Sequence, residues 1–245
     1  MNFNRKVVIF FLLFTANKVN AQKTVTNQSL YWMRYYNQLN FNNKFTWHNE
    51  FEDRRFFKNN IQHHIIIHSR LHYKIYHNAD FAVGITYSLQ SPQDPEAIQK
   101  LVIPEVRPEQ EINFSQQTSK RFSFMQRFRI DERFIHNNNG KNLIKGYGFN
   151  FRFRYKFQIN YWLNRKISKF KTVFKIADEI MINTGKNIIY NQFDQNRIYA
   201  GVEHEINKNL SLEFGYLRWY QQKSTGYQFY NREIIRLTLY HKIKI

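Results

Sequence analysis

Apolar and polar residues alternate strictly along the segment from Tyr147 to Ile159. Aromatic or aliphatic side chains occupy its odd positions, and Asn, Arg, Arg, Lys and Gln occupy the even positions after Phe149. Because successive side chains of a strand point to opposite sides, this segment predicts a strand with one apolar and one charged face. The charged face carries Arg152 and Arg154. The pattern alone fits both a soluble sheet with its apolar face inward and a membrane strand with that face toward lipid.

The same alternation recurs in strand-sized pieces along the rest of the chain, and no segment of helical period stands out. The predicted strands are 29–39, 44–56, 61–76, 80–90, 107–117, 121–134, 146–159, 170–183, 193–206, 210–221 and 229–244. Most of them have 11 to 16 residues, whereas strands of globular sheets usually have about 5 to 6. A tilted strand needs about 9 to 11 residues to cross the hydrocarbon layer, so these lengths favour an up-and-down antiparallel transmembrane β-barrel.

Short and long connections alternate between these strands. Tight turns at 77–79, 118–120 and 207–209 alternate with longer polar segments at 91–106, 135–145 and 184–192. Bacterial outer-membrane barrels have short turns at one end, longer loops at the other, and an even number of strands. Eleven predicted strands conflict with that rule. We therefore expect a barrel of 10–12 strands, with 12 favoured if the residues after Gln22 add one, or 10 if the first segment lies outside.

The first residues predict a secretory signal peptide. Arg5 and Lys6 precede an apolar run of 8 residues, 7–14, and a small-residue cleavage site ends at Ala21. The run is far shorter than the roughly 20 residues of a membrane-spanning helix, so we do not expect it to remain as an anchor. We expect residues 1–21 to be removed and residues 22–245 to form a single barrel domain. The absence of cysteine excludes disulfides, thiolate metal sites and lipid attachment through a cysteine.

The chain is strongly basic. Its formal net charge of +19 falls to +16 when Arg5, Lys6 and Lys18 are removed with the signal peptide. In a cytoplasmic protein such a charge would suggest nucleic acid. Export argues against that partner and favours outer-membrane lipids and the phosphates of lipopolysaccharide, with the barrel-insertion machinery as a further expected partner. The sequence names no small-molecule or ion ligand.

If the apolar stripes form the outer face of a barrel, the polar faces of the strands lie in its lumen. Aromatic-rich stripes favour this arrangement, since lipid-facing bands are flanked by aromatic girdles and closure removes the sheet edges. The candidate lumen charge network comprises Glu50, Glu52, Glu109, Glu111, Arg127, Arg129, Arg133, Arg152, Arg154, Glu179, Arg197, Glu203 and Glu213. Trp32, Trp47, Trp162 and Trp219 are interpreted as anchors at the membrane interfaces.

Five arginines of this network, Arg127, Arg129, Arg133, Arg152 and Arg154, lie on adjacent predicted strands. If they are unpaired they form an anion path, because arginine rings select anions in pores. If the glutamates of the network pair with them, they form a structural plug, since arginine forks bind carboxylates bidentately. The leading interpretations are therefore a structural barrel or a narrow channel.

No catalytic, cofactor or metal residue is predicted. His64, His68 and His72 are spaced by four along one strand, so about 13 Å separates each from the next and they cannot chelate one ion together. A cross-strand pair of His48 with His64 or His68 stays open. Outer-membrane barrels can be lipid-modifying enzymes with a serine nucleophile oriented by a histidine, but no strand serine lies in a recognisable nucleophile motif. Such an enzyme, and a soluble periplasmic β-sandwich that binds a ligand, remain alternatives.

Several segments carry a family resemblance. They are 107–110 at a strand start, 126–134, 151–155, 177–179, and the block Phe193-Asp194-Gln195-Asn196-Arg197-Ile198-Tyr199-Ala200-Gly201 followed by 209–216. These segments resemble an exported β-barrel family of Gram-negative bacteria that is catalogued only as a domain of unknown function. The resemblance covers about residues 24–245 and implies an outer-membrane location and no assigned catalytic residue. The chain departs from the commonest outer-membrane ending, an aromatic residue, because its last residue is Ile245.

Overall fold

The computed structural model describes residues 23–164 and 170–245, which form strands and one short 3-10 helix. The strands are β1 Thr24–Asn40, β2 Phe45–Phe56, β3 Gln62–Tyr76, β4 Ala79–Gln90, β5 Ile103–Gln117, β6 Phe122–Asn138, β7 Leu143–Trp162, β8 Thr172–Thr184, β9 Phe193–Glu205, β10 Leu210–Gln222 and β11 Gln228–Lys244. The helix η1, Lys58–Asn60, lies between β2 and β3. None of the helical structure in the described residues is long and apolar enough to cross a membrane. The predicted signal peptide, residues 1–21, and Gln22 lie outside the described residues.

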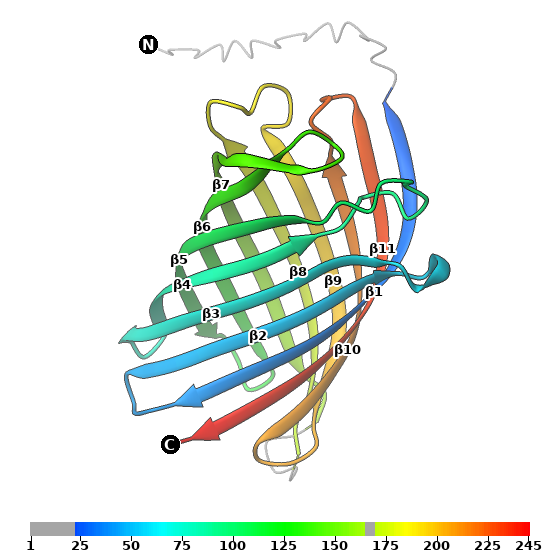
Figure 1. The fold of residues 1–245 in the computed structure, drawn as a ribbon. Helices are drawn as coiled ribbons and strands as arrows, with labels where there is room; N and C mark the ends of the chain where they lie inside the picture. Colours follow the sequence, from blue (N-terminus) through cyan, green and yellow to red (C-terminus); the bar gives the residue numbers. More distant parts are fainter. Residues whose placement is uncertain (1–22, 165–169) are drawn as a thin grey trace, which may run out of the picture.

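The strands close into a barrel through a parallel pair (Figure 1). Each strand pairs antiparallel with its sequence neighbours, whereas β1 pairs with β11 in parallel, from Thr24 opposite Gln228 to Asn40 opposite Lys244. The predicted β-barrel is confirmed. The expected even strand number is wrong, because the described residues contribute eleven strands to the closed sheet. An odd number closes here because the first and last strands run in the same direction.

Side chains alternate between the exterior and the interior of the barrel. On β4, Phe81 and Val83 are 40% and 47% exposed, whereas Ala82 between them is fully buried. On β7, Phe151 and Phe153 are exposed and Arg152 is buried between them. Large apolar side chains thus cover the outside and charged side chains fill the inside, which is the reverse of a soluble protein.

A hydrophobic cluster fills one side of the interior. It consists of Leu30, Trp32, Phe56, Ala177, Tyr199, Leu217, Trp219 and Ile234. Trp32 and Trp219 are only 2% and 3% exposed. Their interpretation as interface anchors is therefore wrong, because each lies in the inward phase of its strand, Trp32 in step with Arg34 and Trp219 with Glu213. Trp47, in contrast, is exposed on the outer face.

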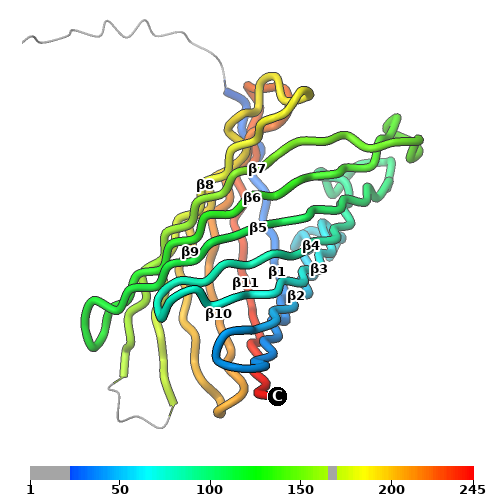
Figure 2. The backbone as a smooth tube through the Cα atoms, turned by 90° about the vertical axis from the view of Figure 1, so that its left-hand side faces the viewer, coloured from blue at the N-terminus to red at the C-terminus, as the bar shows by residue number. Residues whose placement is uncertain are grey.

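The two ends of the barrel carry different connections. The end with residues 57–61, 91–102, 139–142, 185–192 and 223–227 is called the loop end, and the opposite end, with 41–44, 77–78, 118–121 and 206–209, the turn end. The segment 135–145, predicted as a long loop, is mostly strand, because β6 and β7 extend to Asn138 and from Leu143. These two strands are strongly tilted and reach beyond their neighbours (Figure 2).

The longest loop-end connection, 91–102, folds across the barrel toward β1 and β11 (Figure 1). The side-chain oxygen of Gln93 accepts a hydrogen bond from Arg232 Nη2 at 2.9 Å, and its backbone carbonyl accepts one from Gln28 Nε2 at 2.7 Å. The Gln93 oxygen also lies 3.1 Å from His63 Nε2. Hydrogen bonds therefore attach this loop to the inner side of the seam, the β1–β11 pair that closes the barrel.

Candidate functional site

The residues of the predicted lumen network point into the barrel from β2, β5, β6, β7, β8, β9 and β10. Glu50, Glu52, Glu109, Glu111, Arg129, Arg133, Arg152, Glu179 and Glu213 are buried, and Arg127, Arg154, Arg197 and Glu203 are partly exposed to the interior. Strict alternation on tilted neighbouring strands brings these side chains to one interior space. The structure joins most of them in ion pairs.

The central layer of ion pairs runs across β2, β3, β5 and β6. Arg129 contacts Glu111 at 2.5 Å and Glu109 at 3.4 Å. Arg70 holds Glu109 from the other side at 3.0 Å and also pairs with Glu50. Each carboxylate in this layer therefore has an arginine partner, as buried charges require.

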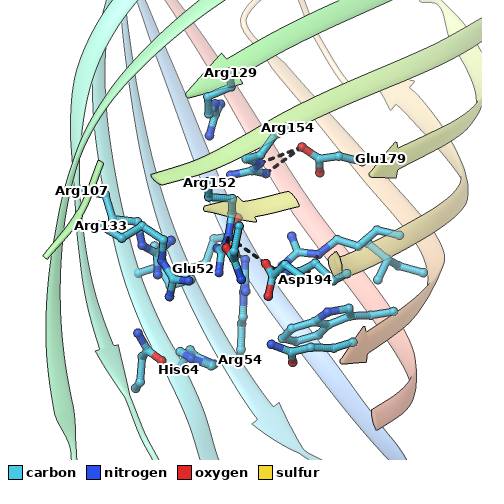
Figure 3. A pocket seen from close by; sticks show the side chains of 18 of the residues that line it. Glu52, Arg54, His64, Arg107, Arg129, Arg133, Arg152, Arg154, Glu179 and Asp194 are labelled. Atoms are coloured by element: carbon cyan, nitrogen blue, oxygen red, sulfur yellow. Dashed lines mark hydrogen bonds and ion pairs between the residues drawn. The ribbon is translucent and has the colours of Figure 1, made fainter. Parts of the chain in front are cut away.

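The arginines of β7 pair with β6, β8 and β9 (Figure 3). Arg154 lies 2.8 Å from Glu179, which Arg127 also contacts at 2.6 Å. Arg152 lies 2.8 Å from Asp194 of β9. Glu179 is thus shared between two arginines, of which Arg154 also contacts the buried Asp131 of β6 at 3.4 Å.

Glu213 organises the layer near β8, β10 and β11. It accepts hydrogen bonds from Lys175 at 2.6 Å, from Arg236 at 2.8 Å and from the Tyr199 hydroxyl at 2.8 Å. The predicted Glu203 pairs with the same Lys175. The Tyr240 hydroxyl also donates to it at 3.2 Å, so four donors offset the burial of a carboxylate that is only 1% exposed.

The sequence interpretation missed two carboxylates that complete the network. Glu105 is fully buried and lies 2.6 Å from Arg107 and 2.5 Å from Arg133. It was placed in a loop because the strand was predicted to begin at Arg107, yet the odd-numbered alternation continues back to it. Asp194 is buried together with its neighbour Gln195 at an irregularity between β8 and β9, so alternation could not indicate both.

Several cations that reach the interior have no carboxylate partner among residues 23–164 and 170–245. They include Arg197, Lys156 and Arg232, the last of which donates to three glutamine side chains. Arg197 donates from Nε to Gln195 at 3.0 Å, and its guanidinium lies over the rings of Trp219 at 4.8 Å and Trp32 at 5.5 Å. Lys156 has no ion pair within 4.0 Å in this part of the chain. These groups differ from the paired interior cations because no carboxylate neutralises them directly.

A cavity of about 500 Å³ lies between the arginine-bearing strands and the hydrophobic cluster. The described residues that line it include eleven arginines and two lysines but four carboxylates. Asn191, Lys223 and Ser224 belong to loop-end connections and line it, so the cavity reaches that end. The remaining carboxylates of the network stand behind the arginines and do not face the cavity.

An aromatic layer lies between the cavity and the turn end. The rings of Tyr36 and Tyr240 are 5.3 Å apart, those of Tyr36 and His48 are 5.4 Å apart, and His48 lies 3.8 Å from His72. Arg34 sits over both tyrosine rings at 5.5 and 5.6 Å. None of the four rings lines the cavity. This layer therefore lies beyond the end of the cavity on the side of the turn end.

Residues 30–230 match the family described as protein of unknown function (DUF2490). The chain belongs to this family. No curated protein matches the sequence. The chain is also similar to a solved structure titled "NanC porin structure in rhombohedral crystal form", with a TM-score of 0.48 and 11% identity over 84% of this chain and 90% of that one. The family match confirms the predicted resemblance to a family of unknown function.

The histidines of this DUF2490 barrel are arranged differently from the cross-strand pair left open by the sequence. His48 lies opposite Arg70 in the β2–β3 register and stacks on His72, not on His64 or His68. Within the described residues, the potential metal ligands Glu50, Glu52 and His68 have ligand atoms within 4.8 Å of one another. Arg70 already pairs with Glu50, and Arg54 Nε donates to Glu52 at 2.6 Å. The arginines thus supply the positive charge that an ion would bring.

The described part of this DUF2490 barrel places no serine hydroxyl in hydrogen-bond contact with a histidine. Ser69, beside His68 in sequence, points outward and accepts a hydrogen bond from Trp47 Nε1 at 2.8 Å. Thr86 Oγ1 lies 2.5 Å from His68 Nδ1 and 3.1 Å from Glu109. In a catalytic triad the imidazole lies between the hydroxyl and the carboxylate, whereas here Thr86 bonds directly to Glu109, and Thr86 has no exposed surface. A substrate cannot reach it without rearrangement of the barrel.

Proposed function

We propose that this protein is an outer-membrane β-barrel that admits small anions at its loop end and conducts them along a narrow, cationic lumen. The observation that carries the proposal is the lining of the cavity, where eleven arginines and two lysines face four carboxylates. Cationic side chains that line a confined path attract anions and repel cations, because the low-dielectric walls focus the field.

The outer surface supports a location within a bilayer. Exposed phenylalanine, isoleucine, leucine, valine and tyrosine side chains cover the strands, including Phe81, Ile85, Phe128, Phe153 and Phe214. Strands of 12 to 20 residues exceed the roughly 9 to 11 needed to cross the hydrocarbon layer. Together with the predicted signal peptide, this favours the outer membrane, with its lipids, lipopolysaccharide and insertion machinery as partners.

The internal packing supports a narrow path and not a wide pore. The hydrophobic cluster and the ion pairs occupy most of the interior, and the cavity of about 500 Å³ suits a small solute. The ring layer of Tyr36, Tyr240, His48 and His72 is the constriction through which a transported anion would pass. We therefore expect low conductance.

Planar-bilayer recording tests the channel. Refolded protein, verified by heat-modifiable gel migration, should give small steps of current in potassium chloride, and a salt gradient should produce a reversal potential that indicates chloride preference. A correctly folded barrel that passes no current, or one that prefers potassium, contradicts the proposal.

Cell fractionation tests the location independently. The protein should be recovered in the outer-membrane fraction and should migrate faster in gels when it has not been boiled. Recovery in the soluble periplasm without heat-modifiable migration would instead support a soluble ligand-binding protein.

A further inference from the structure

The part of the cavity near β2, β7 and β9 holds guanidinium groups from separate walls. Arg54 comes from β2, Arg152 from β7 and Arg197 from β9, and all three line the cavity. Arg107 is a charged neighbour of both Arg54 and Arg152 (Figure 3). The charged groups around Arg197 include the guanidinium groups of Arg54, Arg152 and Arg154 and the carboxylates of Glu179 and Asp194. Positive charge is therefore concentrated around Arg197.

The carboxylates nearby neutralise only part of this charge. Glu105 is shared by Arg107 and Arg133, each of which contacts both of its oxygens at 2.5 to 3.1 Å. Glu52 pairs with Arg54, and Asp194 pairs with Arg152. Arg197 has no such partner in the described part of the chain. Glu105 therefore neutralises only one of its two arginines, and no carboxylate neutralises Arg197. A bound anion would balance this excess of positive charge.

The contacts that hold the Arg197 side chain in position do not involve its terminal nitrogen atoms. Its Nε donates to Gln195, and its planar face lies over Trp219 and Trp32, whose rings meet edge to face. Cation–π contacts fix a guanidinium while leaving its edge free. The Nη atoms of Arg197 and of Arg152 have no hydrogen-bond partner among residues 23–164 and 170–245. Both side chains thus offer unused donors at the cavity.

We propose that Arg197, with Arg152 and Arg54, binds a phosphate-like dianion carried by a small soluble solute. The site deepens the proposed function, on which it rests for entry of the solute from the loop end. Unused Nη donors of Arg197 and Arg152, with the nearby charge of Arg54, come from three strands and suit a tetrahedral oxyanion, whose oxygen atoms point in different directions, better than a chloride ion or a planar carboxylate. The cavity reaches the loop end through Asn191 and Lys223, so the solute arrives from water.

Isothermal titration calorimetry of the folded barrel in a non-ionic detergent tests the site. Inorganic phosphate is the probe, and acetate at equal ionic strength is the comparison. Phosphate should bind with one site per chain and more tightly than acetate. Arg197→Gln should weaken phosphate binding about tenfold or more, since it removes charge-assisted hydrogen bonds. Arg197→Lys, which keeps the charge but lacks the fork, should give an intermediate affinity.

Arg218→Gln is the matched control, because Arg218 lies on the outer face of β10 and bonds to Asn231. It removes one positive charge without touching the cavity, so phosphate binding should be unchanged. Circular dichroism and heat-modifiable migration establish that each variant is folded. If Arg197→Gln proves unstable, the Arg197→Lys result decides, because a purely structural role would leave phosphate affinity of the folded lysine variant at the wild-type value.

The outcomes separate this inference from the channel. Chloride current with no phosphate binding, or with equal acetate and phosphate affinities, overturns the site and leaves the channel standing. Phosphate binding that is lost in Arg197→Gln, in a barrel that passes no current, supports the site and removes the channel. Phosphate binding unaffected by both Arg197 variants also overturns the site.

Discussion

Trp32 of β1 and Trp219 of β10 meet edge to face inside the barrel, with ring centroids 5.8 Å apart at an interplanar angle of 71°. The contact bridges β11, which lies between these two strands in the sheet. It joins the hydrophobic cluster to the arginines, because Arg54 lies 3.8 Å above the Trp32 ring and Arg232 lies 4.4 Å from the Trp219 ring. The indole pair therefore supports both the seam of the barrel and the positions of the nearby cations.

Trp219→Ala should lower the free energy of unfolding by about 3–5 kcal/mol, because it removes a large buried side chain and leaves a cavity. Urea-induced unfolding from lipid vesicles, followed by circular dichroism, measures the change. Trp47→Ala is the control, since Trp47 is 41% exposed on the outer face and should cost less. Equal losses for both variants would show that the interior contact has no special role.

Glu105→Gln should destabilise the barrel by about 3–5 kcal/mol, because Arg107 and Arg133 lose the buried carboxylate that they share. In any folded fraction the extra positive charge should increase chloride preference. Glu132→Gln serves as the comparison, because Glu132 lies on the outward phase of β6, where it accepts a hydrogen bond from Gln110 at 3.1 Å. A stability change no larger than that of Glu132→Gln would contradict the role of Glu105.

Tyr36→Ala should raise single-channel conductance while the preference for chloride is kept. The substitution removes the ring that contacts both Tyr240 and His48, and so widens the layer toward the turn end. Tyr35→Ala, on the exposed face of the same strand, should leave the conductance unchanged. A constriction elsewhere would be indicated if Tyr36→Ala conducted like the unmodified barrel.

Asn27→Cys combined with Asn231→Cys should form a disulfide under oxidising conditions. The two residues face each other in the parallel β1–β11 register, and their side chains are hydrogen-bonded at 2.8 Å. The chain has no other cysteine, so non-reducing gel mobility reports the bond directly. Pairing Asn27→Cys with Ile235→Cys should fail, because four residues along a strand add about 13 Å. The reverse result would contradict the parallel closure.

Much of this fold was predictable because period-two alternation is strong in this chain. The stripe of Phe149, Phe151 and Phe153 opposite Arg152 is sufficient to assign β7 and its two faces. The same reasoning recovers the inward positions of Arg129 and Glu213. Alternation does not indicate which strands close a sheet, so the parallel pairing of β1 with β11 was not predicted. The general rule that bacterial barrels have an even number of strands led to the wrong expected number.

The candidate site was less predictable, because its partners come together only in the folded barrel. Arg152 and Asp194 are 42 positions apart in the chain, and the irregular register beside Asp194 hides its inward direction. Residue type was misleading for Trp32 and Trp219, since tryptophan is common at membrane interfaces and yet here packs inside. Trp32 shares its alternation phase with the inward-facing Arg34, and Trp219 shares its phase with the inward-facing Glu213. This shared phase was the signal that would have placed both rings inside the barrel.

The parallel seam gives the polypeptide a direction across the barrel. Thr24 begins β1 at the loop end, and Lys244 finishes β11 at the turn end. In a bilayer, a reporter domain fused ahead of Thr24 and another fused after Lys244 would face different compartments, whereas an even-stranded antiparallel barrel returns both to the same side. Sidedness in this architecture is therefore set by the parity of the strands, and the gain or loss of one strand would move one terminus to the opposite compartment.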